Sequence, residues 1–215
     1  LQSVKKEEEM QHLTQLQLLQ AQVNPHFLYN TLDTIIWLIE GGQNDDAVEM
    51  ISNLSVFFRT SLSKGNDVIT LSEEKRHTVS YLEIQQSRYR DILEFEIHIP
   101  EEFNEVMVPK LTLQPLIENA IRYGLEQSTQ ICRVQLSVRR QGAQLVLLVQ
   151  NDGSLYEDDL LEKLRQKTVT PHGYGIGLLN IEKRLEFAFG KEAGLELYNE
   201  DGMATARITI PCRVS

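Results

Sequence analysis

Gln20-Ala21-Gln22-Val23-Asn24-Pro25-His26-Phe27-Leu28-Tyr29-Asn30 is the stretch around which the first part of this chain is organised. It lies in a run with helical periodicity, because apolar residues recur every three or four positions on one stripe: Leu13, Leu16, Leu19, Val23 and Phe27. Pro25 interrupts this run, and a proline inside a helix costs roughly 3 kcal/mol, through one lost hydrogen bond and a clash with the preceding turn. A distortion of that size beside a histidine is compatible with a functional segment, and taken alone also with a proline-kinked structural helix that carries a surface histidine.

His26 and Asn30 are the residues of this stretch that can do chemistry. An imidazole is mostly neutral at pH 7, so a ring nitrogen of His26 can act as a nucleophile. Asn30 follows one helical turn later on the same face. Its amide cannot take up a proton, but it can hold a water molecule. The sequence leaves two roles open for Asn30, because it could instead pair with a backbone carbonyl that Pro25 frees.

Composition excludes some classes of function. The chain has 215 residues, a net charge of −10 and a pI near 5.0. This acidic balance argues against nucleic-acid binding. The two cysteines, Cys132 and Cys212, lie far apart without metal-ligand spacing, so reduced thiols in a cytosolic fold are expected.

Membrane-spanning and targeting segments are not visible in the sequence. No apolar run approaches the ~18–20 residues that a transmembrane helix needs, and no signal peptide is recognisable. The chain begins at Leu1, within a helical pattern and without an initiator methionine. We therefore expect a fragment of a longer protein.

The first part of the chain is predicted to be a helical hairpin. One helix covers residues 1–40, Gly41-Gly42 ends it, and a second helix runs from about 45 to 63. A short connection between two long helices makes them antiparallel. Because one hairpin cannot bury its apolar faces alone, we expect a homodimer in which two hairpins form a four-helix bundle.

The rest of the chain alternates between helical and strand patterns. A third helix is predicted over 72–90, and the hydropathy pattern then changes to period two at Phe95, Ile97 and Ile99. The further predicted elements are a helix over 109–125, strands over 132–139 and 144–150, helices over 156–166 and 176–189, and a hairpin of strands 195–199 and 205–210. This order predicts a two-layer α/β sandwich. The predicted class is α+β, with a helical domain over 1–90 and a sandwich domain over 91–215.

Asn119 lies near the buried edge of the predicted helix 109–125, in the segment Gln114-Pro115-Leu116-Ile117-Glu118-Asn119-Ala120-Ile121-Arg122-Tyr123-Gly124. A buried amide needs a partner, and Mg²⁺ or its waters would suit, because Mg²⁺ takes oxygen ligands together with substrate phosphates. Arg122 could meet a phosphate and Tyr123 could stack on a base. Ordinary surface polarity is the alternative interpretation of this segment.

Two further segments, both containing glycine, are candidates for a ligand-binding site. Asn151-Asp152-Gly153 follows a strand but leads into a helical pattern, so its tight turn is not that of a hairpin. Asp152 could accept a hydrogen bond from an exocyclic amine, and Gly153 would let a flat base approach the backbone. His172-Gly173-Tyr174-Gly175-Ile176-Gly177-Leu178-Leu179-Asn180 places three glycines before a helix, where N–H groups can face phosphate. This segment matches neither the Rossmann fingerprint nor the P-loop.

Together these motifs resemble those of sensor histidine kinases of the LytS/YesM type, from about Leu16 to Pro211. Asn24 to Asn30 resembles the phospho-acceptor motif of that family, and Gln114 to Ala120 resembles its N box. Asp152-Gly153 is similar to the first glycine box, and Gly173 to Asn180, with Arg184-Leu185, to the second.

The resemblance implies a role for each of these segments. His26 would be phosphorylated, and Asn119 would bind Mg²⁺. Asp152 would bind adenine, with Gly153 beside it. The remaining residues of the implied nucleotide site are Arg122, Tyr123, Gly173, Gly175, Gly177 and Asn180, of which the glycines form a mobile lid over ATP and its hinge. The fold would be a dimerising helical hairpin followed by an ATP-binding sandwich of the GHKL type.

The implied activity is that of an ATP-dependent histidine kinase, which phosphorylates itself and then an aspartate of a response regulator. From the position of Asn30 one turn after His26, we hypothesise that the water it can hold removes that phosphoryl group from the regulator. The resemblance implies a cytoplasmic part of a cell-membrane protein. Two rival functions are a GHKL-type serine kinase, which would not need Pro25-His26 in a dimerising hairpin, and a non-catalytic scaffold, which would not need Asn119 or the glycines.

Overall fold

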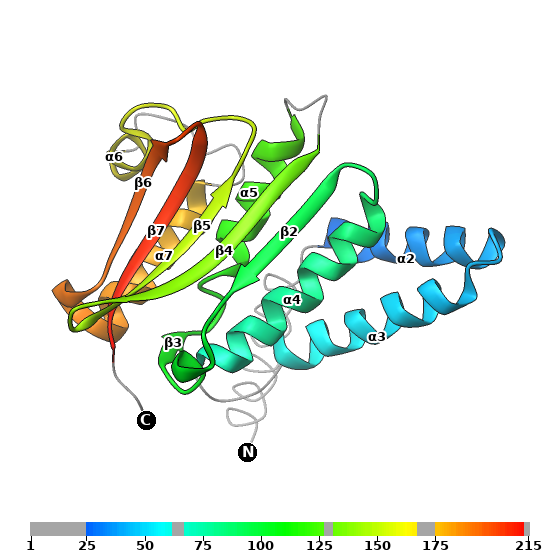
Figure 1. Ribbon diagram of the computed structural model, residues 1–215, viewed down its shortest axis with the longest axis horizontal. Coiled ribbons are helices and arrows are strands. Elements are labelled where there is room, and N and C mark those ends of the chain that lie inside the picture. The colour runs from blue at the N-terminus through cyan, green and yellow to red at the C-terminus, as the bar shows by residue number, and fades with distance from the viewer. Residues whose placement is uncertain (1–24, 62–66, 127–130, 167–174, 213–215) are drawn as a thin grey trace, which may run out of the picture. The chain divides into compact units, whose positions relative to one another are not determined.

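The computed structural model describes residues 25–61, 67–126, 131–166 and 175–212 (Figure 1). Contacts between residues divide the chain into two compact units, 1–64 and 65–215. The first contains a helical hairpin and the second a mixed sheet with helices. The predicted class of helices followed by an α/β sandwich is therefore confirmed. Each unit is described by itself.

The hairpin consists of α2 (Pro25–Glu40) and α3 (Asn44–Ser61), which contact one another. Gly42 adopts a positive φ of 74° in the turn between them, and the amide of Gln43 donates a 2.8 Å hydrogen bond to the carbonyl of Leu38. This conformation explains why the turn needs a glycine. The part of the predicted first helix that precedes Pro25 lies outside the described residues.

A small apolar core holds the two helices together. The buried side chains of Ile35, Leu38, Ala47 and Met50 form one cluster, against which Leu54 packs. Further along, the rings of Phe27 and Phe57 lie 5.0 Å apart between centroids. These contacts use only one face of each helix.

Another face of the hairpin is apolar and exposed. On α2 these side chains recur at spacings of three and four, and two more follow on α3 with the same spacing: Tyr29, Leu32, Ile36 and Ile39, then Val48 and Ile51. We call these six residues the exposed apolar stripe. Exposed apolar side chains that recur along a helix are candidates for an interaction site.

Helix α4 (Leu71–Arg88) begins with a capping box, in which Thr70 and Glu73 exchange hydrogen bonds between side chain and backbone. It contacts β1 (Val68–Thr70), β2 (Leu93–His98) and β3 (Met107–Pro109). The helix that we assigned to the helical domain therefore packs within the second unit. The contacts divide the chain before α4, whereas the predicted domain boundary follows it.

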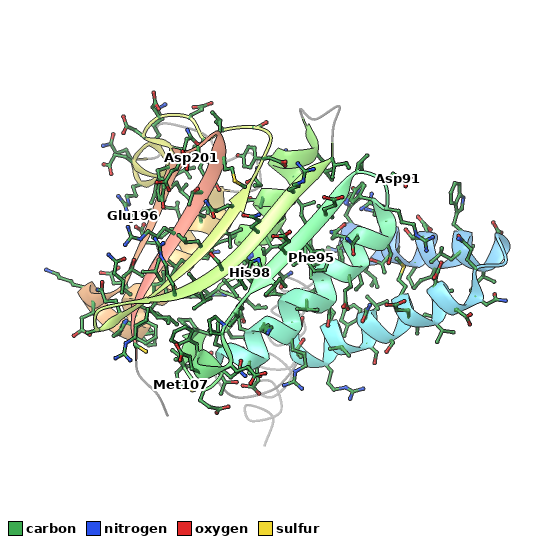
Figure 2. All side chains as sticks on the ribbon, viewed as in Figure 1. Asp91, Phe95, His98, Met107, Glu196 and Asp201 are labelled. Atoms are coloured by element: carbon green, nitrogen blue, oxygen red, sulfur yellow. The ribbon has the colours of Figure 1, made fainter. Side chains whose placement is uncertain are left out.

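Five strands form the main sheet, in the order β2-β4-β5-β7-β6. β2 runs parallel to β4, and all other neighbours are antiparallel. Figure 2 labels Phe95 on β2 and Glu196 on β6, the two edge strands. The remaining strands are β4 (Cys132–Gln141), β5 (Gln144–Asn151), β6 (Gly194–Glu200) and β7 (Met203–Pro211). β5 is central and buried from Leu145 to Val149.

Three helices form the second layer, seen behind the strands in Figure 1. They are α5 (Gln114–Glu126), which contacts β4 and β5, α6 (Leu160–Arg165), which contacts β6, and α7 (Gly175–Phe189), which contacts β6 and β7. α5 begins five residues later than predicted, because β3 and a turn occupy the start of that segment. The two-stranded sheet of β1 and β3 was not predicted, since each strand has only three residues. No helix among the described residues is long and apolar enough to cross a membrane.

Candidate nucleotide site

Helix α5 presents an apolar face to the sheet and a polar face away from it. Leu116, Ile117 and Ala120 are buried. Asn119 is also buried, at 2% exposure. Burying an amide without a partner is costly. The amide of Asn119 is therefore suited to bind a ligand, an ion or an ordered water.

Asp152 lies where β5 ends. Its Oδ1 accepts a 2.5 Å hydrogen bond from the backbone N–H of Arg133, and its own N–H donates to the carbonyl of Arg133. The other carboxylate oxygen lies 3.8 Å from the Arg133 guanidinium in a partly exposed pair. One oxygen thus fixes the side chain to β4, and the second is available as an acceptor for a ligand.

Gly153 lies directly against the last turns of α5. Its φ is +117°, and a Cβ added there would lie 2.9 Å from Cα of Gly124 and 3.3 Å from the carbonyl oxygen of Tyr123. The N–H of Ser154 donates a 3.3 Å hydrogen bond to that same carbonyl. Only glycine allows this approach, which brings the Asp152 turn to the C-terminal end of α5.

The second glycine motif meets the opposite end of α5. Gly175 is the first residue of α7, and a Cβ added at Gly177 would lie 3.4 Å from Cβ of Pro115. Asn180 is exposed on the same helix. Gly173 lies outside the described residues.

Pro115, Asn119 and Tyr123 are spaced by four residues on α5 and therefore lie on one stripe. Asn119 is thus placed between the contact with Gly177 at one end and the contact with Gly153 at the other. Three segments that are far apart in the sequence meet along this stripe. Arg122, half-buried, is on the same helix.

Tyr156 and Asn199 also shape the site, and the sequence did not point to either. Asn199 on β6 binds the backbone of Tyr156 twice, accepting from its N–H and donating to its carbonyl, both at 2.9 Å. The buried ring of Tyr156 packs edge-on against Tyr123, with 6.1 Å between centroids. Burial raises the pKa of the Tyr156 hydroxyl above its ordinary value. The loop after Asp152 is therefore bound to β6 at Tyr156, in addition to its contact with α5 at Gly153.

A polar chain links α4 to α5. The buried His77 ring donates from Nε2 to Oε1 of Gln114 at 2.5 Å, and the amide of Gln114 donates to Glu118 at 2.7 Å. Desolvation raises the pKa of the Glu118 carboxyl, and the hydrogen bond from Gln114 opposes this shift. No sequence pattern would have paired His77 with Gln114, because the two residues are far apart in the chain.

His26 and Asn30 lie in the other unit, on α2. Nδ2 of Asn30 lies 3.1 Å from Nδ1 and 3.2 Å from Nε2 of the His26 ring. An amide N–H can donate to the ring nitrogen that carries a lone pair, and the tautomer decides which nitrogen that is. The two side chains thus lie on one face of α2, as their spacing predicts.

A groove of about 650 Å³ lies elsewhere in the second unit, lined by α6, α7 and β6. None of the predicted site residues lines it. Arg165 crosses between the helices there, bound to Glu182 on α7.

Comparisons with known proteins agree with the motifs. A family model described as histidine kinase matches residues 14–93. The sensor histidine kinase YesM of Bacillus subtilis is 38% identical over 201 residues, which are 93% of this chain and 34% of YesM. The sensor histidine kinase BtsS of Escherichia coli is 35% identical, over 92% of this chain and 33% of BtsS, and the sensor protein LytS of Bacillus cereus is 33% identical, over 86% and 32%. The chain spans about a third of the length of these curated relatives.

Solved structures share the fold. The catalytic domain of histidine kinase ThkA matches 69% of this chain and 97% of its own, with a TM-score of 0.51 and 17% identity. The mycobacterial sensor histidine kinase MprB matches 70% and 100%, with a TM-score of 0.52 and 14% identity. The sheet and its helices thus have the fold of histidine kinase catalytic domains. The resemblance inferred from the motifs is confirmed, since the chain is homologous over most of its length to sensor histidine kinases of the YesM and LytS type.

Gly124→Ala is expected to lower the free energy of unfolding by about 1–3 kcal/mol, the usual cost of overpacking. A Cβ at this position would lie 2.1 Å from Sγ of Cys132. In a Cys132→Ala background the sulfur is absent, and the higher helix propensity of alanine should then offset much of the loss. Urea unfolding of the four proteins in this double-mutant cycle measures the effect. Equal losses in both backgrounds would contradict the packing between α5 and β4.

Proposed function

We propose that this chain is the catalytic part of a sensor histidine kinase that transfers the γ-phosphoryl group of ATP to His26, and then to an aspartate of a response regulator. The observation that carries the proposal is the stripe on α5, where a buried amide lies between two glycine contacts. The homology over most of the chain supports the same activity. Residues 1–90 would supply the phosphorylated histidine and 91–215 the ATP site, and the family match that ends at residue 93 supports this division.

The residues of the site fit Mg·ATP. Asp152 keeps one carboxylate oxygen for the adenine amine, and Gly153 lets the turn that carries Asp152 pack against α5. The oxygen of Asn119 is of the type that Mg²⁺ prefers, and the ion would neutralise charge on the phosphates when bound. Among the described residues no group of three or more His, Cys, Asp or Glu side chains could hold a metal ion. In this proposal Arg122, Tyr123, Asn180 and the glycines 173, 175 and 177 surround the nucleotide.

The transfer itself needs little covalent work from the protein. A ring nitrogen of His26 forms a bond to the γ-phosphorus while the bond from that phosphorus to the bridging oxygen breaks. ADP leaves with the electron pair, and the proton on the other ring nitrogen passes to water. Asn30 lies beside the ring, with its amide nitrogen 3.1 Å from Nδ1, and is not needed for this transfer. Its amide would later place a water against the phosphorylated regulator.

Incubation of the chain with γ-labelled Mg·ATP should label His26, and His26→Gln should abolish the label. The label should be lost in acid and retained in base, as for phosphohistidine. Asn30→Ala should still be labelled, and the phosphoryl group on an added receiver domain should live longer in its presence.

Label that survives acid and is lost in base would instead favour a serine kinase, and no label at all would favour a scaffold. If Asn30→Ala loses both the label and thermal stability, Asn30 has a structural role only.

Asp152→Asn should weaken binding of a non-hydrolysable ATP analogue about 10- to 100-fold, because an amide donor would then face the adenine amine and leave a donor unpaired at a cost of about 1–3 kcal/mol. The side-chain oxygen can still accept from Arg133, so stability should change little. Asp158→Asn, an exposed acid on the same loop, is the matched control. Calorimetric titration provides the affinities, and equal affinities for both variants would refute the role of Asp152.

The homodimer belongs to the same proposal, and the exposed apolar stripe supports it. Ile36→Glu should convert a dimer into monomers, because the charge would be buried between two hairpins. Phe187→Glu makes the same kind of change at a site that is 91% exposed, and should leave the dimer intact. Sedimentation equilibrium at micromolar concentration compares them. A wild-type chain that sediments as a monomer would exclude the bundle.

A further inference from the structure

The turn between β3 and α5 has an unusual backbone. Leu111 has a φ of +58°, in the left-handed region that branched, bulky residues rarely enter. Such a conformation persists only where the surrounding structure enforces it. The turn Lys110–Leu113 therefore needs support from outside its own segment.

Glu74 of α4 supplies the first support. Its side chain is fully buried, with 0% exposure. Oε2 accepts a 3.0 Å hydrogen bond from the N–H of Leu111, and Oε1 accepts a 2.8 Å bond from the N–H of Leu113. A buried carboxylate is expensive unless it is paired in this way. Desolvation raises the pKa of Glu74, while the backbone N–H groups of the turn and the charge of Arg184 oppose the shift.

Arg184 of α7 supplies the second support. Its Nη1 donates to the carbonyl of Lys110 at 3.0 Å and to that of Leu111 at 3.4 Å. Arg184 itself is exposed. The N–H groups of the turn are thus bound by α4 and its carbonyl groups by α7, so the turn is held by two oppositely charged side chains.

The turn leads directly into the helix that carries Asn119. The carbonyl of Leu113 accepts from the N–H groups of Leu116 and Ile117, which begins α5. Gly177, two residues into α7, packs beside Pro115 in the same turn of α5. A shift of Lys110–Leu113 would therefore move Asn119 relative to the second glycine motif.

We propose that Glu74 and Arg184 are positioning residues of the nucleotide site, which clamp the turn Lys110–Leu113 and so hold α5 and α7 in the arrangement that binds the nucleotide. Neither residue needs to touch the nucleotide. This inference rests on the proposed function where nucleotide affinity is its readout. It extends that function to Glu74 of α4, which lies outside the motifs, and gives a positioning role to Arg184 at the end of the second glycine motif.

Arg184→Ala provides the main test, because an exposed side chain can be removed without unfolding the protein. We expect the affinity of the full chain for a non-hydrolysable ATP analogue with Mg²⁺ to fall about 10- to 100-fold, the usual loss when a residue that orients a binding group is removed. Lys183→Ala removes the same charge from the preceding, exposed position and should change affinity by no more than about twofold. Arg184→Lys keeps one donor and should recover part of the loss. Equal affinities for the Arg184→Ala and Lys183→Ala proteins would overturn the proposal.

Amide hydrogen exchange without nucleotide separates the clamp from the proposed function. Arg184→Ala should speed exchange at Leu113 and in the first turn of α5 by about tenfold or more relative to Lys183→Ala, since backbone bonds that lose their support open more often. Glu74→Gln, which has a single acceptor oxygen for two N–H groups, should speed exchange at Leu111 and Leu113 still more. If the wild-type chain binds no nucleotide, the proposed function fails and exchange alone decides the clamp. Unchanged exchange in the Arg184→Ala protein would overturn it.

Discussion

The contact between α5 and the loop after β5 is the constraint on which the rest of the second unit depends. Gly153 lies so close to Gly124 that it has no room for a Cβ, and Gly124 has none because of the side chain of Cys132. Gly124 in turn packs on Cys132 at the start of β4, where burial, and next the charge of Asp152, raise the pKa of the thiol to about 12. The thiol therefore stays neutral and acts as a packing group. Because these contacts leave no room for a larger side chain, they fix how α5, β4 and the loop after β5 pack together.

This arrangement determines which side of α5 is available to a ligand. The apolar side chains of α5 pack against the sheet. The stripe of Pro115, Asn119 and Tyr123 therefore faces the two glycine motifs. A buried amide needs a hydrogen-bond partner, and a ligand at this position can supply one.

The two units differ in how they are stabilised. The sheet unit has its own core, formed by β4, β5 and β7 with the helices that cover them. The hairpin has only a narrow core around Ile35 and Met50, and it leaves the exposed apolar stripe uncovered. Helices of this length gain most of their stability from packing rather than from propensity. The hairpin is therefore the part of the chain that stands to gain most from a partner.

The sequence by itself determined the local features of this protein. The helix of His26 and Asn30, the strand periodicity around Phe95 and the three motif segments follow from spacing and residue type, which act over a few neighbouring positions. Tertiary structure alone decided the pairing of β1 with β3, the later start of α5 and the packing of α4 in the second unit. It also decided the contacts of Glu74 with Leu111 and Leu113, and of Asn199 with Tyr156. These contacts join residues that lie more than thirty positions apart, and no local pattern encodes them, because a carboxylate or an amide can bind any backbone group that the fold brings within reach.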